Sequence, residues 1–313
     1  MEPLPPVGEA IESRPLNQGA EVTMSRSIRR RDFLITAASG AAGLATASAR
    51  AFGAEQAASA DPDLHMYLAF GQSNMEGFPG IEAQDKTGVD PRFRMLAAVD
   101  FTNLGRRKGE WYEAIPPLCR SSTGLCPADY FGRTMVSRMP ERITIGVVNV
   151  AVAGCKIELF DQSTSQAYAA TAPPWMTSII ATYGGSPYQH LVDMAKLAKQ
   201  KGVIKGILLH QGESNTNDTQ WPNKVAKIYR DLLTDLNLEG AKVPLLVGET
   251  VNADQQGATA SMNTIIAELP KVVPSARVIS SKGCECRADH LHFTPAGYRE
   301  LGKRYAETML ALV

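Results

Sequence analysis

Short apolar segments alternate with amphipathic ones along most of this 313-residue chain, and this alternation constrains the fold more than any other feature. Near-continuous apolar runs are typical of strands that are buried on both faces of a sheet. The amphipathic segments have helical periodicity and are bounded by Gly or Pro. Predicted strands cover residues 65–70, 143–152, 203–210, 243–247 and 276–280, and predicted helices cover residues 190–200, 223–237, 258–269 and 296–312.

Strands that alternate with helices pair in parallel, because each crossover helix returns the chain to the end of the sheet at which the previous strand began. The sequence therefore predicts an α/β fold, a three-layer α/β/α sandwich with a central, mostly parallel sheet. Functional sites in such folds gather at the carboxyl ends of the strands. Residues 80–125 are rich in Gly, Pro and charge without clear periodicity, and we interpret them as a long insertion beside the site. Its Trp111 and Tyr112 are candidates to stack on a sugar or to fill a local cluster.

The charge balance excludes one large class of function. Lys plus Arg and Asp plus Glu both number 32, so the formal net charge is zero. Binding to nucleic acid or to an anionic membrane surface requires a basic patch, which this balance does not indicate. We therefore expect no nucleic-acid partner, and a single catalytic domain over residues 61–313.

Residues 1–60 resemble an export signal rather than a folded domain. Arg30 and Arg31 precede a weakly apolar run of small residues, as in a bacterial twin-arginine signal. The run is shorter than the roughly 20 apolar residues of a membrane-spanning helix. We expect recognition by the twin-arginine export machinery, a mature start between about residues 50 and 61, no stable membrane span in the mature form, and a periplasmic or secreted location. Met24 is an alternative initiator to Met1, because the residues before it are polar and contain Pro.

Five cysteines fit an oxidising destination, where disulfides persist. Structural disulfides are favoured over metal binding, because no His or Cys cluster has the spacing of a zinc site. We expect no metal and no cofactor. The pairing stays open, and the odd number leaves at least one thiol unpaired among Cys119, Cys126, Cys155, Cys284 and Cys286.

Ser73 is the candidate nucleophile. It directly follows a predicted strand, in the segment Gly-Gln-Ser-Asn-Met-Glu-Gly of residues 71–77. A Ser at this place presents its hydroxyl at the sheet edge, and a following helical turn aims backbone N–H groups at an oxyanion. The segment is not the Gly-x-Ser-x-Gly elbow of α/β-hydrolases, since Met75 occupies the position of the second Gly.

A nucleophilic Ser needs a base, and a late segment supplies a His together with a carboxylate. Asp289 precedes His292 by three residues, a spacing that lets Asp289 accept the Nδ1 proton while Nε2 faces a hydroxyl. His290 is the rival base, but the adjacent Asp289 has poorer geometry for reaching its ring. The alternative interpretation is that Asp289 only caps a turn.

Two other strand ends carry small or polar residues. Residues 210–215 read His-Gln-Gly-Glu-Ser-Asn and follow a predicted strand, where their side chains can donate to an oxyanion or support the base. Gly154 follows another strand, and its lack of a side chain would let a backbone N–H approach a reacting carbonyl closely. Each block on its own also fits an ordinary turn.

In this order, the four blocks resemble the SGNH hydrolase superfamily, and within it carbohydrate esterase family six and the sialate O-acetylesterases. The resemblance covers residues 64–313 and implies the same sandwich fold. It implies that Ser73 is the nucleophile, that His292 is the base and that Asp289 is the partner of the base. The backbone N–H groups of Ser73 and Gly154 would be two oxyanion donors.

The superfamily's third oxyanion donor is an Asn, but this chain has Ser214 at that position. We therefore expect the amide of Gln211 to replace it. Glu213 is similar to a Glu with which the carbohydrate esterases assist the catalytic His, so it is expected to complement Asp289 or to compete with it.

The resemblance implies a serine esterase that removes O-acetyl groups from carbohydrates through an acyl-enzyme. One alternative is a lipase, a thioesterase or a peptidoglycan O-acetyl esterase on the same fold. Another is an inactive secreted carbohydrate-binding protein, against which the intact Ser73, Asp289 and His292 argue. The acetylated glycan stays open between xylan, a sialic acid and others, as does the oligomeric state.

Overall fold

The computed structural model describes residues 60–78 and 80–313. The export signal predicted from Arg30 and Arg31 lies outside this part of the chain. Within the described residues, no helix has the length and apolar character needed to cross a membrane.

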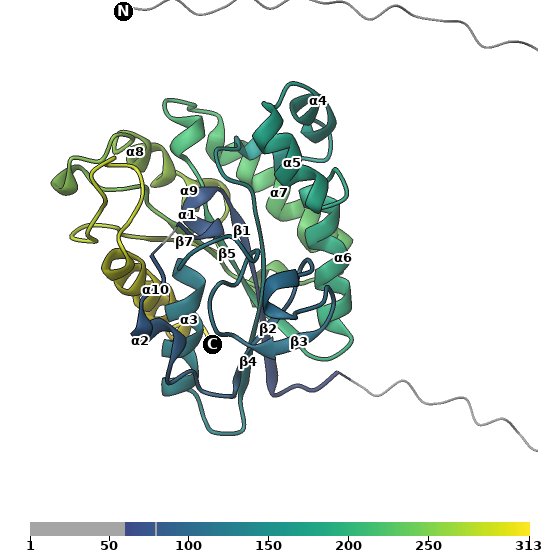
Figure 1. Ribbon diagram of the computed structural model, residues 1–313. Helices are drawn as coiled ribbons and strands as arrows, with labels where there is room; N and C mark the ends of the chain where they lie inside the picture. The colour runs from purple at the N-terminus through teal and green to yellow at the C-terminus, as the bar shows by residue number, and fades with distance from the viewer. Residues whose placement is uncertain (1–59, 79) are drawn as a thin grey trace, which may run out of the picture. The chain divides into compact units, whose positions relative to one another are not determined.

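A seven-stranded sheet forms the centre of the fold, in the order β3-β2-β4-β1-β5-β6-β7 (Figure 1). All neighbouring strands are parallel except the edge strand β3, which runs antiparallel to β2. The central strand β1 is buried along almost its whole length, as its apolar run predicts. The strands are β1 (Leu64–Gly71), β2 (Phe93–Leu96), β3 (Trp111–Glu113), β4 (Thr144–Ala151), β5 (Val203–His210), β6 (Leu245–Gly248) and β7 (Ala276–Ile279).

Helices cover both faces of the sheet. Figure 1 shows α3 and α10 on one side, and α6 and α7 on the other. The predicted three-layer α/β/α sandwich is therefore confirmed. The longer helices are α3 (Pro127–Arg138), α5 (Pro174–Thr182), α6 (Pro187–Lys199), α7 (Trp221–Asp235) and α10 (Pro295–Leu310), and the shorter ones are α1 (Ser73–Glu76), α2 (Ala83–Lys86), α4 (Ser165–Ala170), α8 (Met262–Ile266) and α9 (Leu269–Val272).

Two glycines let α3 and α10 pack closely against their neighbours. A Cβ at Gly302 of α10 would lie 2.4 Å from the backbone oxygen of Pro127, so only Gly permits this helix contact. A Cβ at Gly132 of α3 would meet the ring of Phe93 on β2. The two contacts bring α10 close to α3 and α3 close to the sheet.

All five predicted strands are present, but two other predictions were wrong. The predicted helix 258–269 is two short helices, α8 and α9, and Pro270 lies in the first turn of α9, where its missing N–H is not needed. Residues 80–125 are not a plain insertion, because they contribute β2 and β3 to the sheet. Strands of four and three residues are too short to show a period.

The two aromatic residues of this region belong to the sheet. Trp111 and Tyr112 lie on β3, partly buried against the core, and the ring of Trp111 lies beside Gly146 of β4. They thus form part of a local cluster at the sheet edge, away from the residues around Ser73.

The five cysteines are all free thiols, so the predicted disulfides are wrong. The buried sulfurs have different polar neighbours. The sulfur of Cys119 lies 3.3 Å from the hydroxyl of Tyr183. Cys126 is the N-cap of α3, and its sulfur accepts a hydrogen bond from the amide of Asn149. Cys155 lies 3.8 Å from the backbone oxygen of residue 71. Their placement in the core follows from Cys behaving as a small hydrophobe.

Candidate active site

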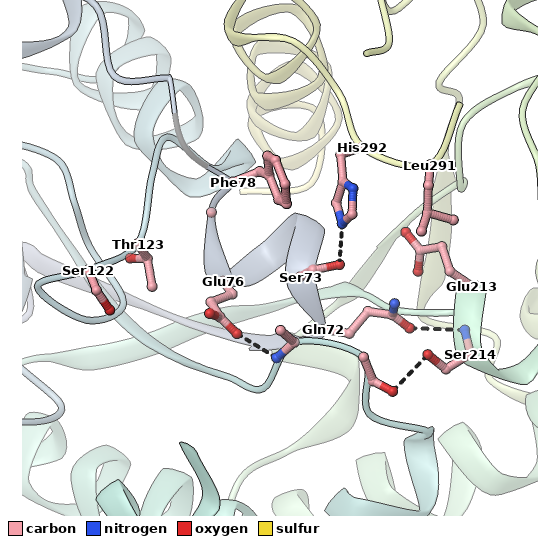
Figure 2. A pocket seen from close by; sticks show the side chains of 13 residues that line it. Gln72, Ser73, Glu76, Phe78, Ser122, Thr123, Glu213, Ser214, Leu291 and His292 are labelled. Atoms are coloured by element: carbon pink, nitrogen blue, oxygen red, sulfur yellow. Dashed lines mark hydrogen bonds between the residues drawn. The ribbon is translucent and has the colours of Figure 1, made fainter. Parts of the chain in front are cut away.

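A hollow of about 360 Å³ opens at the carboxyl ends of β1, β4 and β5. We call it the Ser73 hollow. Its walls come from the turn after β1, the loops after β4 and β5, the segment before α10, and residues 122–123 (Figure 2). Parallel sheets of this kind form their functional sites at the carboxyl ends of the strands.

The structure brings three of the candidate residues into one hydrogen-bonded line. The Nε2 atom of His292 lies 2.9 Å from the hydroxyl oxygen of Ser73 (Figure 2), and its Nδ1 atom lies 2.8 Å from Oδ2 of Asp289. Ser73 begins α1 directly after β1, and the other two residues lie on the loop before α10. In this geometry His292 can accept the hydroxyl proton while the carboxylate fixes its tautomer.

The carboxylate of Asp289 is held ready for this role by its own loop. Burial opposes its ionisation, but the N–H and the ring of His292 and the N–H of Leu291 outweigh burial and lower its pKa to about 2. The two backbone N–H groups lie 2.9 and 3.0 Å from Oδ1. The rival His290 instead lies with its Nδ1 3.1 Å from the backbone oxygen of Gln255, outside the hollow lining.

Asn74, the buried neighbour of Ser73, joins the serine to the loop of the base. Its amide nitrogen donates to the backbone oxygen of Leu291 at 3.0 Å, and its oxygen accepts from the N–H of Phe293 at 3.4 Å and from the hydroxyl of Tyr298 at 2.8 Å. Leu291 and Phe293 are the residues on either side of the base. Asn74 therefore links the turn that carries Ser73 to the segment that carries His292.

Glu213 lines the hollow, but its contacts are with Asn74 and His210 rather than with the base. Its Oε1 accepts from the amide of Asn74 at 2.6 Å and lies 3.6 Å from Nε2 of His210. Burial opposes its ionisation, yet the contacts with His210 and Asn74 hold the pKa of Glu213 below its usual range. The structure thus connects Glu213 to Asn74, the residue after Ser73, and not to His292.

The two residues predicted to supply backbone oxyanion donors, Ser73 and Gly154, both line the Ser73 hollow. Ser73 is the first residue of α1, and within the described residues its N–H has no acceptor. Gly154 has a φ of +66°, which favours Gly, and it lines the same hollow. Both predicted backbone donors therefore lie around one hollow.

A buried ion pair fixes the loop that carries Gly154. One oxygen of Glu76 accepts a hydrogen bond from the N–H of Ala153 (Figure 2). The other oxygen pairs with the guanidinium of Arg120. Arg120 also donates to the backbone oxygen of Ala151 at 2.8 Å and to the hydroxyl of Tyr183 at 2.9 Å. Burial raises the pKa of Glu76 above its usual range, although Arg120 opposes this effect.

The amide of Gln211 does not reach the hollow. Its nitrogen donates to Oε1 of Gln72 at 3.1 Å and to Oδ1 of Asn215 at 2.7 Å, its oxygen accepts from the indole of Trp221, and the residue is fully buried. Gln211 was predicted to face the substrate, but in the structure another side chain lies between it and the hollow.

That side chain is Gln72. Its Oε1 accepts from Gln211 and from the N–H of Ser214, so its other amide atom is the nitrogen. Figure 2 shows this nitrogen turned into the hollow beside Ser73. Sequence reasoning missed Gln72, although its position next to the candidate nucleophile was a usable signal.

Phe78 closes the hollow over the base. Its ring stacks on that of His292, with centroids 4.1 Å apart and planes inclined by 22°. The guanidinium of Arg287 lies 4.9 Å from the same phenyl ring. The sequence did not single out Phe78, because the contact joins residues that are remote along the chain.

Among the described residues, no group of three or more His, Cys, Asp or Glu side chains could hold a metal ion. Ser214 directs its hydroxyl to the backbone oxygen of Gly154 at 2.9 Å, which ties the loops after β4 and β5 together. The hollow is therefore built from hydrogen-bond donors, two carboxylates and one stacked ring.

The comparisons with known proteins agree with this site. The family model described as "carbohydrate esterase, sialic acid-specific acetylesterase" matches residues 63–311. This match covers most of the chain and identifies it as a carboxylic ester hydrolase. Within that class, the chain belongs to the carbohydrate esterase family of the sialic acid-specific acetylesterases, and the resemblance drawn from the four sequence blocks is confirmed.

Solved structures share the fold at low sequence identity. A protein from Arabidopsis thaliana superposes with a TM-score of 0.61 at 19% identity, over 80% of this chain and 99% of that one. A carbohydrate acetylesterase from Xanthomonas citri gives a TM-score of 0.57 at 17% identity, over 79% of this chain and 56% of that one. NanS gives 0.57 at 15% identity, over 80% and 98%.

Proposed function

We propose that this protein is a carbohydrate O-acetylesterase in which Ser73 is the nucleophile, His292 the general base and Asp289 its orienting carboxylate. The observation that carries the proposal is the hydrogen-bonded line from Asp289 through His292 to Ser73 at the floor of a hollow. Membership of an esterase family supports the same chemistry.

In the proposed reaction, Ser73 attacks the acetyl carbonyl as His292 takes the hydroxyl proton. The tetrahedral intermediate forms with its oxyanion facing the N–H groups of Ser73 and Gly154. His292 then gives the proton to the leaving sugar hydroxyl, and water attacks the acetyl-enzyme with His292 again as base. Acetate leaves and the serine is restored.

The third oxyanion donor in this proposal is Gln72. Its amide nitrogen faces the hollow, while Gln211 and the N–H of Ser214 hold its oxygen. Such an amide is pre-organised, so it needs no rearrangement as negative charge develops. Gln211 then acts as a positioning residue that contacts the donor rather than the substrate.

The size of the hollow favours a small acyl group. About 360 Å³ lined by carboxylates, hydroxyls and amides accommodates an acetyl ester of a sugar, whereas a long acyl chain needs an extended apolar channel. An acyl series on one alcohol tests this: kcat/KM falls steeply beyond two or three carbons if the proposal holds, and a lipase would show the opposite trend.

Replacing Ser73 tests the nucleophile. We expect Ser73→Ala to lower kcat for acetate release from an acetylated sugar by about three orders of magnitude or more, because the acyl-enzyme can no longer form. Ser137→Ala, which changes an exposed hydroxyl on α3, is the control and keeps full activity. An organophosphonate should label wild type and leave Ser73→Ala unlabelled. Activity retained in Ser73→Ala would remove the assignment.

We also propose that the chain is exported by the twin-arginine machinery to the periplasm or the medium, on the basis of Arg30, Arg31 and the small-residue run after them. Replacing both Arg30 and Arg31 by Lys keeps the positive charge but removes the arginine pair. The expected result is a full-length precursor that accumulates inside the cell, detected by fractionation, whereas normal release of a processed chain contradicts this route.

A further inference from the structure

A second hollow adjoins the Ser73 hollow, and nothing in the proposed chemistry uses it. It measures about 490 Å³ and shares Ser122 with the lining of the Ser73 hollow. Its walls carry hydroxyl groups beside apolar side chains: Ser121 and Ser122 come from one segment, and Ser178 and Thr182 come from α5.

An exposed tryptophan stands at the border of the Ser73 hollow. Trp175 on α5 has 53% of its surface exposed, which makes it the bulkiest well-exposed apolar side chain among the described residues. A Cβ added to Gly154 would lie 2.7 Å from the indole edge of Trp175, so the ring lies directly against the Gly154 loop. An indole left in water at the edge of a site is typical of a ligand-binding surface.

The helix places the tryptophan and the hydroxyls on one side. Ser178 and Thr182 follow Trp175 by three and seven residues along α5, a spacing that puts all three on the same face of a helix. The indole that borders the Ser73 hollow and the hydroxyls that line the second hollow thus belong to one continuous surface.

The charges of this surface fit a neutral ligand. Arg120 lines the second hollow, but its guanidinium is already bound by Glu76, by the hydroxyl of Tyr183 and by the backbone oxygen of Ala151. The carboxylate of Asp100 is the other charged group of the lining. Two carboxylates, Glu76 and Glu213, line the Ser73 hollow, and no Lys or Arg belongs to that lining.

We propose that the two hollows and Trp175 form one extended groove that binds a neutral O-acetylated oligosaccharide, with the acetylated unit at Ser73 and a neighbouring sugar unit on Trp175 and the second hollow. A sugar ring offers an apolar C–H face and a rim of hydroxyls, which match the indole and the Ser and Thr hydroxyls. This inference rests on the proposed esterase function and names its substrate class.

The test compares a polymeric with a small substrate. For Trp175→Ala we expect the ratio of kcat/KM on acetylated xylo-oligosaccharides to kcat/KM on 4-nitrophenyl acetate to fall about tenfold or more, as for the loss of a central aromatic contact. Trp175→Phe retains most of the ratio. Val272→Ala, which shortens an exposed side chain on α9, is the control and keeps it fully. A ratio within twofold of wild type in Trp175→Ala overturns the proposal.

Replacing Trp175 also changes the packing against Gly154, so a second variant leaves Trp175 in place. Ser178→Trp places a bulky side chain on the exposed face of α5, where it fills the second hollow, and the same tenfold fall in the ratio is expected. An O-acetylated sialic acid serves as the anionic comparison. A kcat/KM for it above that for the xylo-oligosaccharides would contradict the neutral substrate class.

The two proposals fail in distinguishable ways. If wild type releases no acetate from any of these esters, the proposed function falls, but the groove is still testable by calorimetry. In the Ser73→Ala background, unacetylated xylohexaose should bind, and Trp175→Ala should weaken that binding about tenfold. Binding that is undetectable or independent of Trp175 overturns the groove.

Discussion

At the scale of residues, the sequence predicted contacts between residues that are close along the chain. It did not predict contacts between side chains that come from distant segments. Asp289 and His292 are three residues apart, so their contact follows from one loop. The contact between Asn74 and the residues beside His292 joins segments 217 and 219 residues apart, and no spacing predicts it. For the same reason the sequence could not tell which of Gln72 and Gln211 faces the hollow.

The two carboxylates near the base should differ in their effect on catalysis. We expect Asp289→Asn to lower kcat by about 10²- to 10⁴-fold, because the base loses the acceptor that fixes its tautomer. Glu213→Gln should lower kcat less, since Glu213 contacts Asn74 rather than His292. Steady-state kinetics on one acetylated sugar measures both, with circular dichroism to verify folding. Equal losses in two folded variants would contradict these separate roles.

At the scale of elements, long apolar strands were predictable and short or broken ones were not. β5 has the predicted bounds, because a run of eight residues carries a clear pattern. β2 and β3 owe their existence to neighbours in the sheet rather than to their own sequence. Cys126 is the N-cap of α3, and its N–H donates to the carboxylate of the buried Asp129 at 2.9 Å, an arrangement that only the folded chain reveals.

This cap should make stability depend on pH. Burial raises the pKa of Asp129 to about 7, against the effect of the N–H of Cys126, from an ordinary value of 3.8. The folded state therefore binds the proton more tightly, and the resulting stability is complete below pH 4 and is lost as pH rises through 7. About three pKa units correspond to at most about 4 kcal/mol.

Chemical denaturation at pH 5 and pH 8 measures this effect. Asp129→Asn cannot ionise, so the variant should lose less free energy of unfolding between the two pH values than wild type does. Asp193→Asn, on the exposed face of α6, is the control and should follow wild type. Parallel pH profiles for wild type and Asp129→Asn would show that Asp129 does not titrate in this range.

At the scale of the whole molecule, the class of fold followed from the sequence because alternating buried strands and helices leave few arrangements. The state of the cysteines could not be predicted from the sequence. The number of cysteines only fits an oxidising compartment, whereas pairing depends on where the fold places each sulfur. Four of the five thiols are buried in the core, and Cys286 is partly buried.

The free thiols give a prediction for the mature domain. Dithiothreitol should leave Tm unchanged, because no covalent cross-link is lost. A thiol reagent should titrate five groups in denaturant and at most about one in the folded protein, since burial raises the pKa of the four buried thiols and blocks access to them. Fewer than five groups in non-reducing denaturant would show a disulfide.

The proposed base, His292, comes late along the chain, on the loop between β7 and α10. A nascent polypeptide that has emerged as far as β7 already contains every strand of the sheet and the serine, yet it has no base. In the proposed mechanism, hydrolysis therefore requires that this loop has been synthesised and lies against Asn74. A premature stop codon before that loop would remove the proposed base, so under this mechanism turnover reports that synthesis has continued past the loop.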